Sequence, residues 1–277
     1  MFDFLSLIGN SRRYTFHSHT EFCDGRAQME AFAREAVAQG FSHYGFSPHS
    51  PIPIASPCNM LSSNVDRYLG EVSRIRRDHS DSGVRFYAGM EIDYLGDDWG
   101  PSIDYFHTIP LDYSIGSVHF IPSQAGELVD IDGRFESFRR KMIEHFRDDI
   151  RYVVEKFYEQ SIRMVEAGGF DIIGHLDKVG HNAGHYSEGI EDESWYVSLS
   201  DELVDKVIAS GVTVELNTKA QRDHGRFFPS TRLLRKLVAA GAPIIVNSDA
   251  HVPALIDASR DEAFELLDSI KHSQDIG

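Results

Sequence analysis

Cysteine is scarce in this chain of 277 residues, which contains only Cys23 and Cys58. Two cysteines exclude a disulfide framework of the kind that holds small secreted domains together. Long apolar runs are also lacking, and no stretch approaches the roughly 18 apolar residues of a membrane-spanning helix. The first residues, MFDFLSLIGNSRR, lack the basic start and continuous apolar run of a secretory signal. We therefore expect a cytoplasmic, soluble protein without a membrane partner.

Basic residues are outnumbered by acidic ones. The chain has 27 Lys and Arg against 43 Asp and Glu, which gives a formal net charge of −16. This charge opposes binding to nucleic acid or to an anionic membrane surface, so neither is expected as the main partner. A small phosphorylated substrate is still compatible with it, because a cationic metal site reverses the local field.

Linkers and internal repeats are missing too. No low-complexity tract or Pro/Gly/Ser-rich segment divides the chain, and its length is common for a single α/β barrel. Hydrophobic residues make up 42% of the sequence, which is enough for one large core. We expect one domain over residues 1–277, with its core at about residues 14–274.

Short β-rich runs alternate with longer segments of helical periodicity. The helical period is clearest over residues 27–40, 138–167 and 230–243, and again after Pro253. Several β runs are almost wholly apolar, as strands covered on both faces of a parallel sheet are. This alternation predicts right-handed crossovers and, at this length, a distorted TIM-like (βα)7 barrel. The seven predicted strands are residues 14–19, 43–49, 84–93, 113–120, 170–176, 213–218 and 243–249.

Side chains that can bind metals lie at or just after the end of nearly every predicted strand. In a parallel barrel these carboxyl ends meet on one face, where active sites are built. Imidazole and carboxylate groups are ligands that zinc, iron and manganese favour. The side chains are His17, His19, Asp24, His49, Glu91, His119, His175, Glu215, Asn217, Asp249 and His251.

Each of these signals is weak alone. A His-x-His pair on a strand suits a solvated face as well as chelation, and a lone histidine such as His119 is more often a hydrogen-bonded structural residue. Glu91 alone suits a buried salt bridge. Carboxylates and imidazoles are costly to bury after apolar runs, so their recurrence at seven strand ends indicates a shared metal site. The other histidines, including His181 and His185 shortly after His175, are not assigned to this set.

As a set, the motifs resemble the PHP (polymerase and histidinol phosphatase) superfamily. The resemblance rests on HSHTEFCDG and SDAH, with a His, a Glu and a His after strands two, three and four. GFSPHSPIP, AGMEIDY, GSVHF, DIIGHLDKVG and ELNTKAQR are similar to the PHP-type histidinol-phosphate phosphatases, and the likeness extends from about residue 14 to 252. One departure is Pro48, since family members commonly have an acidic residue at this position. A role of that missing carboxylate in orienting a ligand is therefore in doubt.

The resemblance implies a cluster of three divalent metal ions, zinc, iron or manganese, at the carboxyl-terminal face of the barrel. Glu91 would bridge two of them. The implied ligand groups are His17, His19, Glu91 and Asp249 for one ion, Glu91, His119 and His175 for a second, and Asp24, His49 and His251 for a third.

The resemblance also implies hydrolysis of a phosphate monoester by attack of metal-bound hydroxide. The substrate would be L-histidinol phosphate, converted to L-histidinol and phosphate in histidine biosynthesis. Asp249 or His251 is a candidate to relay a proton to the leaving group, although a ligand role competes with this. Two other functions fit the same residues: a PHP phosphoesterase for nucleotides or other phosphoesters, and a non-catalytic PHP barrel.

Charged side chains after the later strands are candidates for substrate contacts. Arg222 is the first candidate for binding the phosphate, because guanidinium groups bind phosphate in a bidentate manner, and Lys178 is the next. Glu215 is the candidate for recognising the amino group or imidazole. Lys219 and Arg226 are interpreted as solvated surface charges. The oligomeric state and a lid role for residues 120–138 are left open by the sequence.

Overall fold

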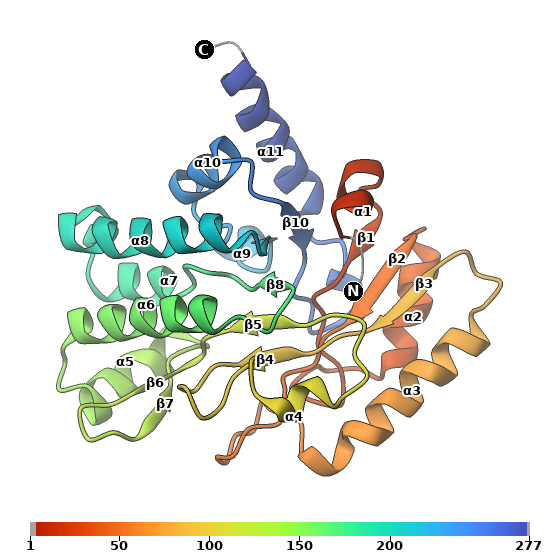
Figure 1. Cartoon of the computed structure of the whole chain (residues 1–277), viewed down its shortest axis with the longest axis horizontal. Coiled ribbons are helices and arrows are strands. Elements are labelled where there is room, and N and C mark those ends of the chain that lie inside the picture. Colours follow the sequence, from red (N-terminus) through yellow and green to blue (C-terminus); the bar gives the residue numbers. More distant parts are fainter. Residues whose placement is uncertain (1–3, 276–277) are drawn as a thin grey trace.

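Parallel strands follow one another around a barrel in the order in which they occur in the chain (Figure 1). The computed structural model describes residues 4–275. One sheet has the order β1-β2-β3 and a second has the order β4-β5-β8-β9-β10, with every neighbouring pair parallel. The bounds are β1 Tyr14–Thr15, β2 His43–Phe46, β3 Arg85–Ala88, β4 Glu91–Asp93, β5 Ile115–Ser117, β8 Ile172–Ile173, β9 Thr213–Asn217 and β10 Ile244–Asn247.

Backbone bridges join the two sheets at both of their seams. Ser18 pairs with Ala250 just beyond β1 and β10, and His49 pairs with Glu91 just beyond β2. Both bridges are parallel and lie at the carboxyl ends of β1, β2 and β10. The seven strand positions therefore surround one interior, and the seams lie where the predicted site residues are.

The prediction of one strand over residues 84–93 was wrong, because the chain passes from the first sheet to the second at Gly89. A Cβ atom on Gly89 would lie 2.1 Å from Cζ of Tyr113, so only glycine fits at this crossing. Tyr113 is buried inside the barrel, and its hydroxyl donates a hydrogen bond of 2.6 Å to the carbonyl of Phe16. β3 and β4 are consequently separate strands that occupy one position in the barrel.

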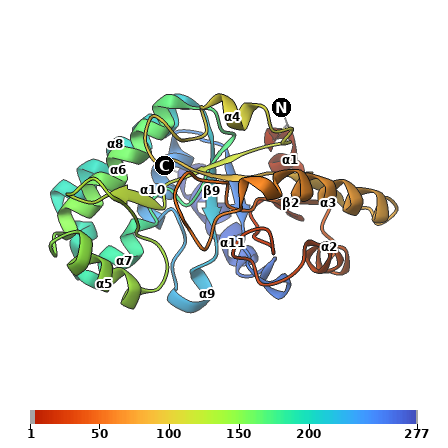
Figure 2. The same ribbon diagram turned by 90° about the horizontal axis from the view of Figure 1, so that it is seen from below.

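Helices cover the outside of the barrel. In both views α6 and α8 lie side by side at one end of the molecule, and α2 and α3 lie at the opposite end (Figures 1 and 2). Among the helices of the described residues, none has the length and apolarity to cross a membrane. The helices are α1 Phe4–Asn10, α2 Met29–Ala38, α3 Val65–Asp78, α4 Asp104–His107, α5 Phe135–His145, α6 Ile150–Ala167, α7 Val179–Tyr186, α8 Ser194–Ser210, α9 Gln221–His224, α10 Thr231–Ala239 and α11 Arg260–Asp275, with 3₁₀ turns at Ser62–Asn64, Ile190–Asp192 and Pro253–Leu255.

The continuous helical pattern over residues 138–167 conceals a break between α5 and α6. Arg147 and Asp148 have φ angles of 50° and 65°, which a helix cannot contain. The carboxylate of Asp149 then caps α6 by accepting a hydrogen bond from the backbone N–H of Tyr152. The apolar pattern continues across the break because both helices pack against the same core. Helices α3 and α8 were not among the helical segments predicted from the sequence.

Residues 120–138, whose role the sequence left open, form a hairpin followed by the start of α5. Strands β6 (Phe120–Pro122) and β7 (Leu128–Asp130) pair in an antiparallel manner outside the barrel. Phe120, Asp130 and Asp132 line a cavity at the carboxyl-terminal face. This segment therefore forms one wall of that cavity.

Candidate metal centre

The side chains predicted as metal ligands converge at the carboxyl ends of the strands. They come from the segments after β1, β2, β5, β8 and β10 and from the first residue of β4. Each has an ion-pair distance of less than 4 Å to at least one other member, and most of them are buried. The members of this set, called the metal cluster below, are His17, His19, Asp24, His49, Glu91, His119, His175, Asp249 and His251.

Glu91 lies at the centre of the metal cluster and is completely buried. Its Oε1 atom is 2.9 Å from Nε2 of His175 and 3.5 Å from Nε2 of His119. Its Oε2 atom lies 3.1–3.4 Å from nitrogens of three further imidazoles, those of His17, His19 and His49. The two oxygens therefore face different groups of histidines, which is the geometry that a bridging carboxylate needs.

Asp249 forms a second contact point. Its Oδ1 atom is 3.1 Å from Nε2 of His19 and 3.8 Å from Nε2 of His17. Oδ2 accepts a hydrogen bond of 3.2 Å from the amide of Asn217. The φ angle of Asp249 is 50°, a left-handed conformation that aspartate tolerates better than most residues and that is often found at functional sites.

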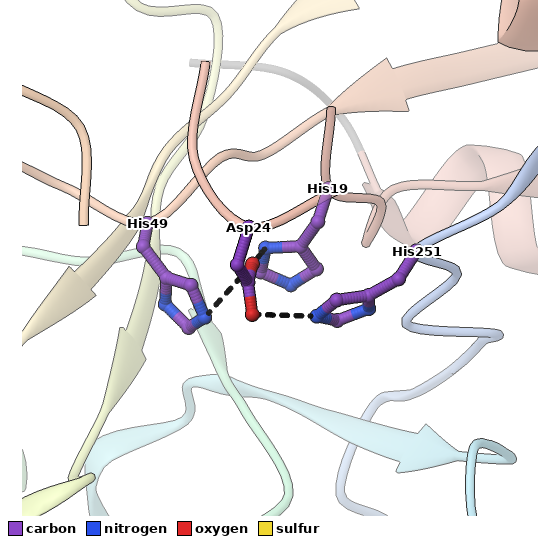
Figure 3. Close-up of side chains that lie close together, drawn as sticks. All are labelled: His19, Asp24, His49 and His251. Atoms are coloured by element: carbon purple, nitrogen blue, oxygen red, sulfur yellow. Dashed lines mark ion pairs between the residues drawn. The ribbon is translucent and has the colours of Figure 1, made fainter. Parts of the chain in front are cut away.

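Asp24 forms a third contact point, on the outer side of the metal cluster. Figure 3 shows its carboxylate between the rings of His19, His49 and His251, which come from different segments. Oδ2 is 3.3 Å from Nε2 of His251, and Oδ1 is 3.7 Å from Nδ1 of His19 and 3.8 Å from Nε2 of His49. Four potential ligand atoms thus face a common point.

Several buried ligand atoms lack a hydrogen-bond partner among the described residues. They are Nε2 of His17, Oδ1 of Asp24, Nδ1 of His49 and Oε2 of Glu91. A buried polar atom without a partner is costly, and all four atoms point into the same cluster. Because imidazole nitrogens and carboxylate oxygens are ligands of divalent metal ions, the residues fit such ions well. The distances are compatible with the three predicted ligand groups, and the number of ions and the role of each residue stay predictions.

The imidazoles differ strongly in proton affinity. Burial, together with His251 and His49, holds the pKa of His19 well below its usual range. Burial also disfavours the charged form of His119, but Glu91 and Asp93 outweigh it and raise the pKa of His119 to about 9. Burial also disfavours the charged form of His17, but Glu215, Glu91 and Asp249 surround the ring and together raise its pKa well above its usual range.

Glu215 lies behind the metal cluster, where its position favours support of His17 over the predicted contact with the substrate. It is completely buried, with Oε1 2.6 Å from Nδ1 of His17 and Oε2 accepting a hydrogen bond from the backbone N–H of His175. The amides of Asn217 and Asn247 donate to it as well. These contacts occupy both oxygens and fix the orientation of His17, as carboxylates behind metal-binding histidines commonly do.

Asp93, which was not among the predicted site residues, has a similar position behind His119. Its Oδ1 atom is 2.6 Å from Nδ1 of His119, which leaves Nε2 of that ring directed at Glu91. The sequence did contain a signal, because residues two apart on a strand face the same side. Asp93 is two residues after Glu91 on β4.

A cavity of about 640 Å³ opens in front of the metal cluster. His49, His119 and His251 form part of its floor, and Lys178 and Lys219 line its sides. Its volume is within the range of sites for small molecules.

The basic residues at this cavity differ from the prediction in two respects. Arg222 has a 55% exposed side chain, is not part of the cavity lining and pairs with Asp223 at 2.9 Å on the short helix α9. Lys219, interpreted as a surface charge, instead lies 3.1 Å from Oδ1 of Asp249. Lys178 lines the cavity as well and pairs with Asp132 at 2.7 Å.

Comparison with known families identifies the class of the protein. The family model for the PHP domain matches residues 15–219, so the chain belongs to the PHP domain family. The family resemblance inferred from the motifs is thereby confirmed.

The chain is similar over most of its length to one curated protein and to two proteins of known structure, described here in turn. A protein of Schizosaccharomyces pombe named "Probable histidinol-phosphatase" is 25% identical over 266 residues, which cover 91% of this chain and 85% of that protein. The crystal structure of the protein hisK from Listeria monocytogenes has a TM-score of 0.78 at 19% identity and covers 90% of this chain and 99% of its own. The structure of histidinol phosphate phosphatase from Lactococcus lactis, complexed with zinc, L-histidinol and phosphate, has a TM-score of 0.69 at 18% identity, with 94% of both chains covered. The predicted TIM-like α/β fold is confirmed by these similarities.

Replacing Glu215 by glutamine should weaken metal binding about 10- to 100-fold, because an amide no longer offers two acceptor oxygens to His17 and its neighbours. The metal content after dialysis against graded concentrations of a chelator measures this. The matched control is Glu127→Gln on the cavity-wall hairpin, where the side chain is 67% exposed and contacts only His145 among the ion pairs of the described residues. Equal resistance to the chelator in both variants would contradict the orienting role.

Metal uptake by the metal-free protein should release protons. His119 has a pKa raised to about 9, so its ring is mostly protonated at pH 7.5 and must lose its proton to bind metal; the pKa of His17 is shifted in the same direction. Calorimetry in buffers of different ionisation enthalpy should detect release of at least one proton per chain at pH 7.5 and less at pH 9.5, where His119 is already mostly neutral. By the same linkage, His119 stabilises the metal-free fold fully below pH 6.5 and loses this contribution as the pH rises through about 9. Metal uptake without proton release at pH 7.5 would show that these rings are neutral beforehand.

Proposed function

We propose that this chain is a metal-dependent phosphatase that hydrolyses L-histidinol phosphate to L-histidinol and phosphate. The observation that carries the proposal is a buried set of imidazoles and carboxylates around Glu91, at the floor of a cavity flanked by two lysines. Membership of the PHP domain family agrees with it. The names of the S. pombe and L. lactis relatives support the choice of substrate.

Three divalent metal ions, zinc, iron or manganese, would be held by the metal cluster. His17, His19, Glu91 and Asp249 form the first ligand group. The other two groups are Glu91 with His119 and His175, and Asp24 with His49 and His251. When bound, such ions neutralise charge on the phosphoryl group and lower the pKa of water at the centre. The protein supplies the rigid arrangement, because Glu215 and Asp93 orient two of the rings.

Lys219 and Lys178 would bind the phosphate. The Nζ atom of Lys219 lies 3.1 Å from Asp249 and 3.4 Å from Nε2 of His251, which places its charge at the edge of the metal cluster. The surrounding carboxylates, Asp132 first, hold the pKa of Lys178 above its usual range despite burial, so this side chain is charged at neutral pH. An ammonium group binds a phosphate oxygen through charge-assisted hydrogen bonds.

The remainder of the substrate fits the outer part of the cavity. L-histidinol phosphate has an ammonium group and an imidazole ring beyond its phosphate. Acidic side chains that would attract the ammonium group line the outer cavity, and aromatic side chains beside them offer a surface to the ring. These residues are Asp130, Glu136 and Asp223, with Phe120, Phe135 and Phe228.

His251 is the better placed of the two predicted proton donors to the leaving group. It lines the cavity with a partly exposed side chain, whereas Asp249 is 2% exposed and held by Lys219 and Asn217. A general acid must reach the leaving oxygen directly or through one water molecule. Asp249 would therefore act as a ligand, and His251 as the group that can also transfer a proton.

Phosphate release from L-histidinol phosphate by metal-reconstituted protein tests the proposal. We expect kcat/KM for this substrate to exceed that for nucleoside monophosphates and simple alkyl phosphates, and Asp249→Asn to lower kcat at least about 10²-fold. Asp268→Asn on α11, where the carboxylate is exposed and paired with Arg12, is the matched control and should retain full activity. If a nucleoside monophosphate were the preferred substrate, the proposed substrate would be wrong. If none of these phosphate esters were hydrolysed, the proposed catalytic role would be refuted.

Lys219 and Arg222 should behave differently on substitution by methionine. Loss of Lys219 removes a charged partner of the phosphate and should lower kcat/KM about tenfold or more, with weaker product inhibition by phosphate. Arg222→Met should change kcat/KM by less than about twofold, because the Arg222 side chain faces solvent. Steady-state kinetics with phosphate as inhibitor measure both, and the reverse order would restore the prediction made from the sequence.

A further inference from the structure

A second group of histidines lies at the mouth of the cavity, outside the metal cluster. His181 and His185 are four residues apart on α7, so their rings are on the same side of the helix. His224 is the last residue of α9, in the segment that follows the next strand of the barrel. The ring centroid of His181 lies 4.7 Å from that of His185 and 4.5 Å from that of His224. One nitrogen from each of the three rings lies within 4.8 Å of the others.

The hydrogen bonds of these rings leave nitrogen lone pairs available. Nδ1 of His185 donates to the backbone carbonyl of His181 at 2.9 Å, because a carbonyl can only accept, so Nε2 of His185 carries the lone pair. In the part of the chain that the structure describes, no side-chain hydrogen bond is found for the rings of His181 and His224. Burial, then His224 and His185, lowers the pKa of His181 to about 4, so this ring is neutral at pH 7.

Carboxylates near these histidines are engaged elsewhere. Asp223, next to His224, forms two hydrogen bonds with Arg222 at 2.9 and 3.0 Å. Glu191 pairs with both terminal nitrogens of Arg226 at 2.6 and 2.7 Å. The three rings are therefore not part of a network of histidine–carboxylate ion pairs, and their own charges would repel one another. A ligand that accepts several neutral imidazoles fits this arrangement best.

We propose that His181, His185 and His224 form an additional binding site for a divalent metal ion of the zinc class. Two histidines at i and i+4 on a helix are a recurrent zinc-binding arrangement, and a third ligand from another segment completes a three-nitrogen set. Tetrahedral coordination at about 2.0–2.1 Å requires nitrogens about 3.3 Å apart. The ring nitrogens, which lie within 4.8 Å of one another, would therefore move closer together when the ion binds. A water molecule occupies the fourth position in sites of this type.

The ion would connect two segments of the cavity mouth. The three histidines separate the main cavity from a neighbouring one of about 490 Å³, and they line both. α7 begins directly after Lys178, and α9 begins two residues after Lys219. A bound ion would thus hold in place the segments that carry both lysines; this consequence, unlike the metal site itself, rests on the proposed function. His185 and His224 are exposed, so the ion should exchange more readily than ions in the buried metal cluster.

Zinc binding measured without substrate tests the site. Protein that retains its metal cluster ions is analysed for metal content and then titrated with Zn²⁺ in a calorimeter. The wild type should bind one zinc ion per chain more than His185→Ala and His224→Ala, while all three have the same metal content before titration. His272→Ala, which removes an exposed histidine from α11, should bind as the wild type does. Equal zinc binding by wild type and both mouth variants would overturn the proposal.

Anomalous diffraction gives a second measurement that is independent of variant stability. Crystals of the wild type soaked in Zn²⁺ should show an anomalous peak about 2 Å from the ring nitrogens of His181, His185 and His224, in addition to peaks at the metal cluster. Peaks at the metal cluster alone would refute the additional site. Neither measurement uses substrate, so a failure of the proposed phosphatase activity would leave the zinc count and the anomalous peak unchanged.

Discussion

A carboxylate buried at the centre of five imidazoles is the constraint on which the rest of the site depends. Glu91 has no exposed surface, and burying an uncompensated carboxylate costs several kcal/mol in effective terms. The strand ends around it must therefore supply positive charge, either as protons on the rings or as bound metal ions. Its position is set by the crossing at Gly89, where the chain leaves one sheet for the other around Tyr113. The packing of Gly89 against Tyr113 therefore determines where β4 begins and, with it, where Glu91 lies.

The charges of the site are arranged in layers from the barrel interior to the cavity. Glu215 and Asp93 lie behind the rings of His17 and His119 and determine which nitrogen of each ring faces Glu91. In front of them lie the lysines, whose positive charge attracts an anion despite the net charge of −16 for the chain. An acidic protein can accordingly present a locally favourable site to a phosphate. The position of each carboxylate in these layers determines its role: Glu91 is a predicted ligand, Glu215 orients His17, and Asp132 lines the cavity.

Much of the fold and the ligand-type residues could be predicted, and the errors have a common cause. The strand ends were recognisable because the apolar runs stop at histidines and carboxylates. In a parallel barrel the carboxyl ends of all strands lie on the same face, so these side chains were expected to be close together. Which basic residue turns toward the cavity was not recognisable: Arg222 and Lys219 are three residues apart, but Arg222 lies on the short helix α9 and Lys219 lies just before it, so the two side chains take different directions. The buried position of Glu215 was not recognisable either, because it depends on Asn247 and His17 from other segments of the barrel.

By itself, the sequence determined the alternation of strands and helices, the family, and the side chains able to bind metal. These properties depend on local periodicity and on short motifs, which act over a few residues. Only the tertiary structure decided how these side chains share Glu91 and which groups stand behind them. It also brought His224 to the pair His181 and His185, to which no sequence motif connects it. The physical reason is that such contacts join segments tens to hundreds of residues apart, and their geometry is set by barrel closure and core packing, which no local pattern encodes.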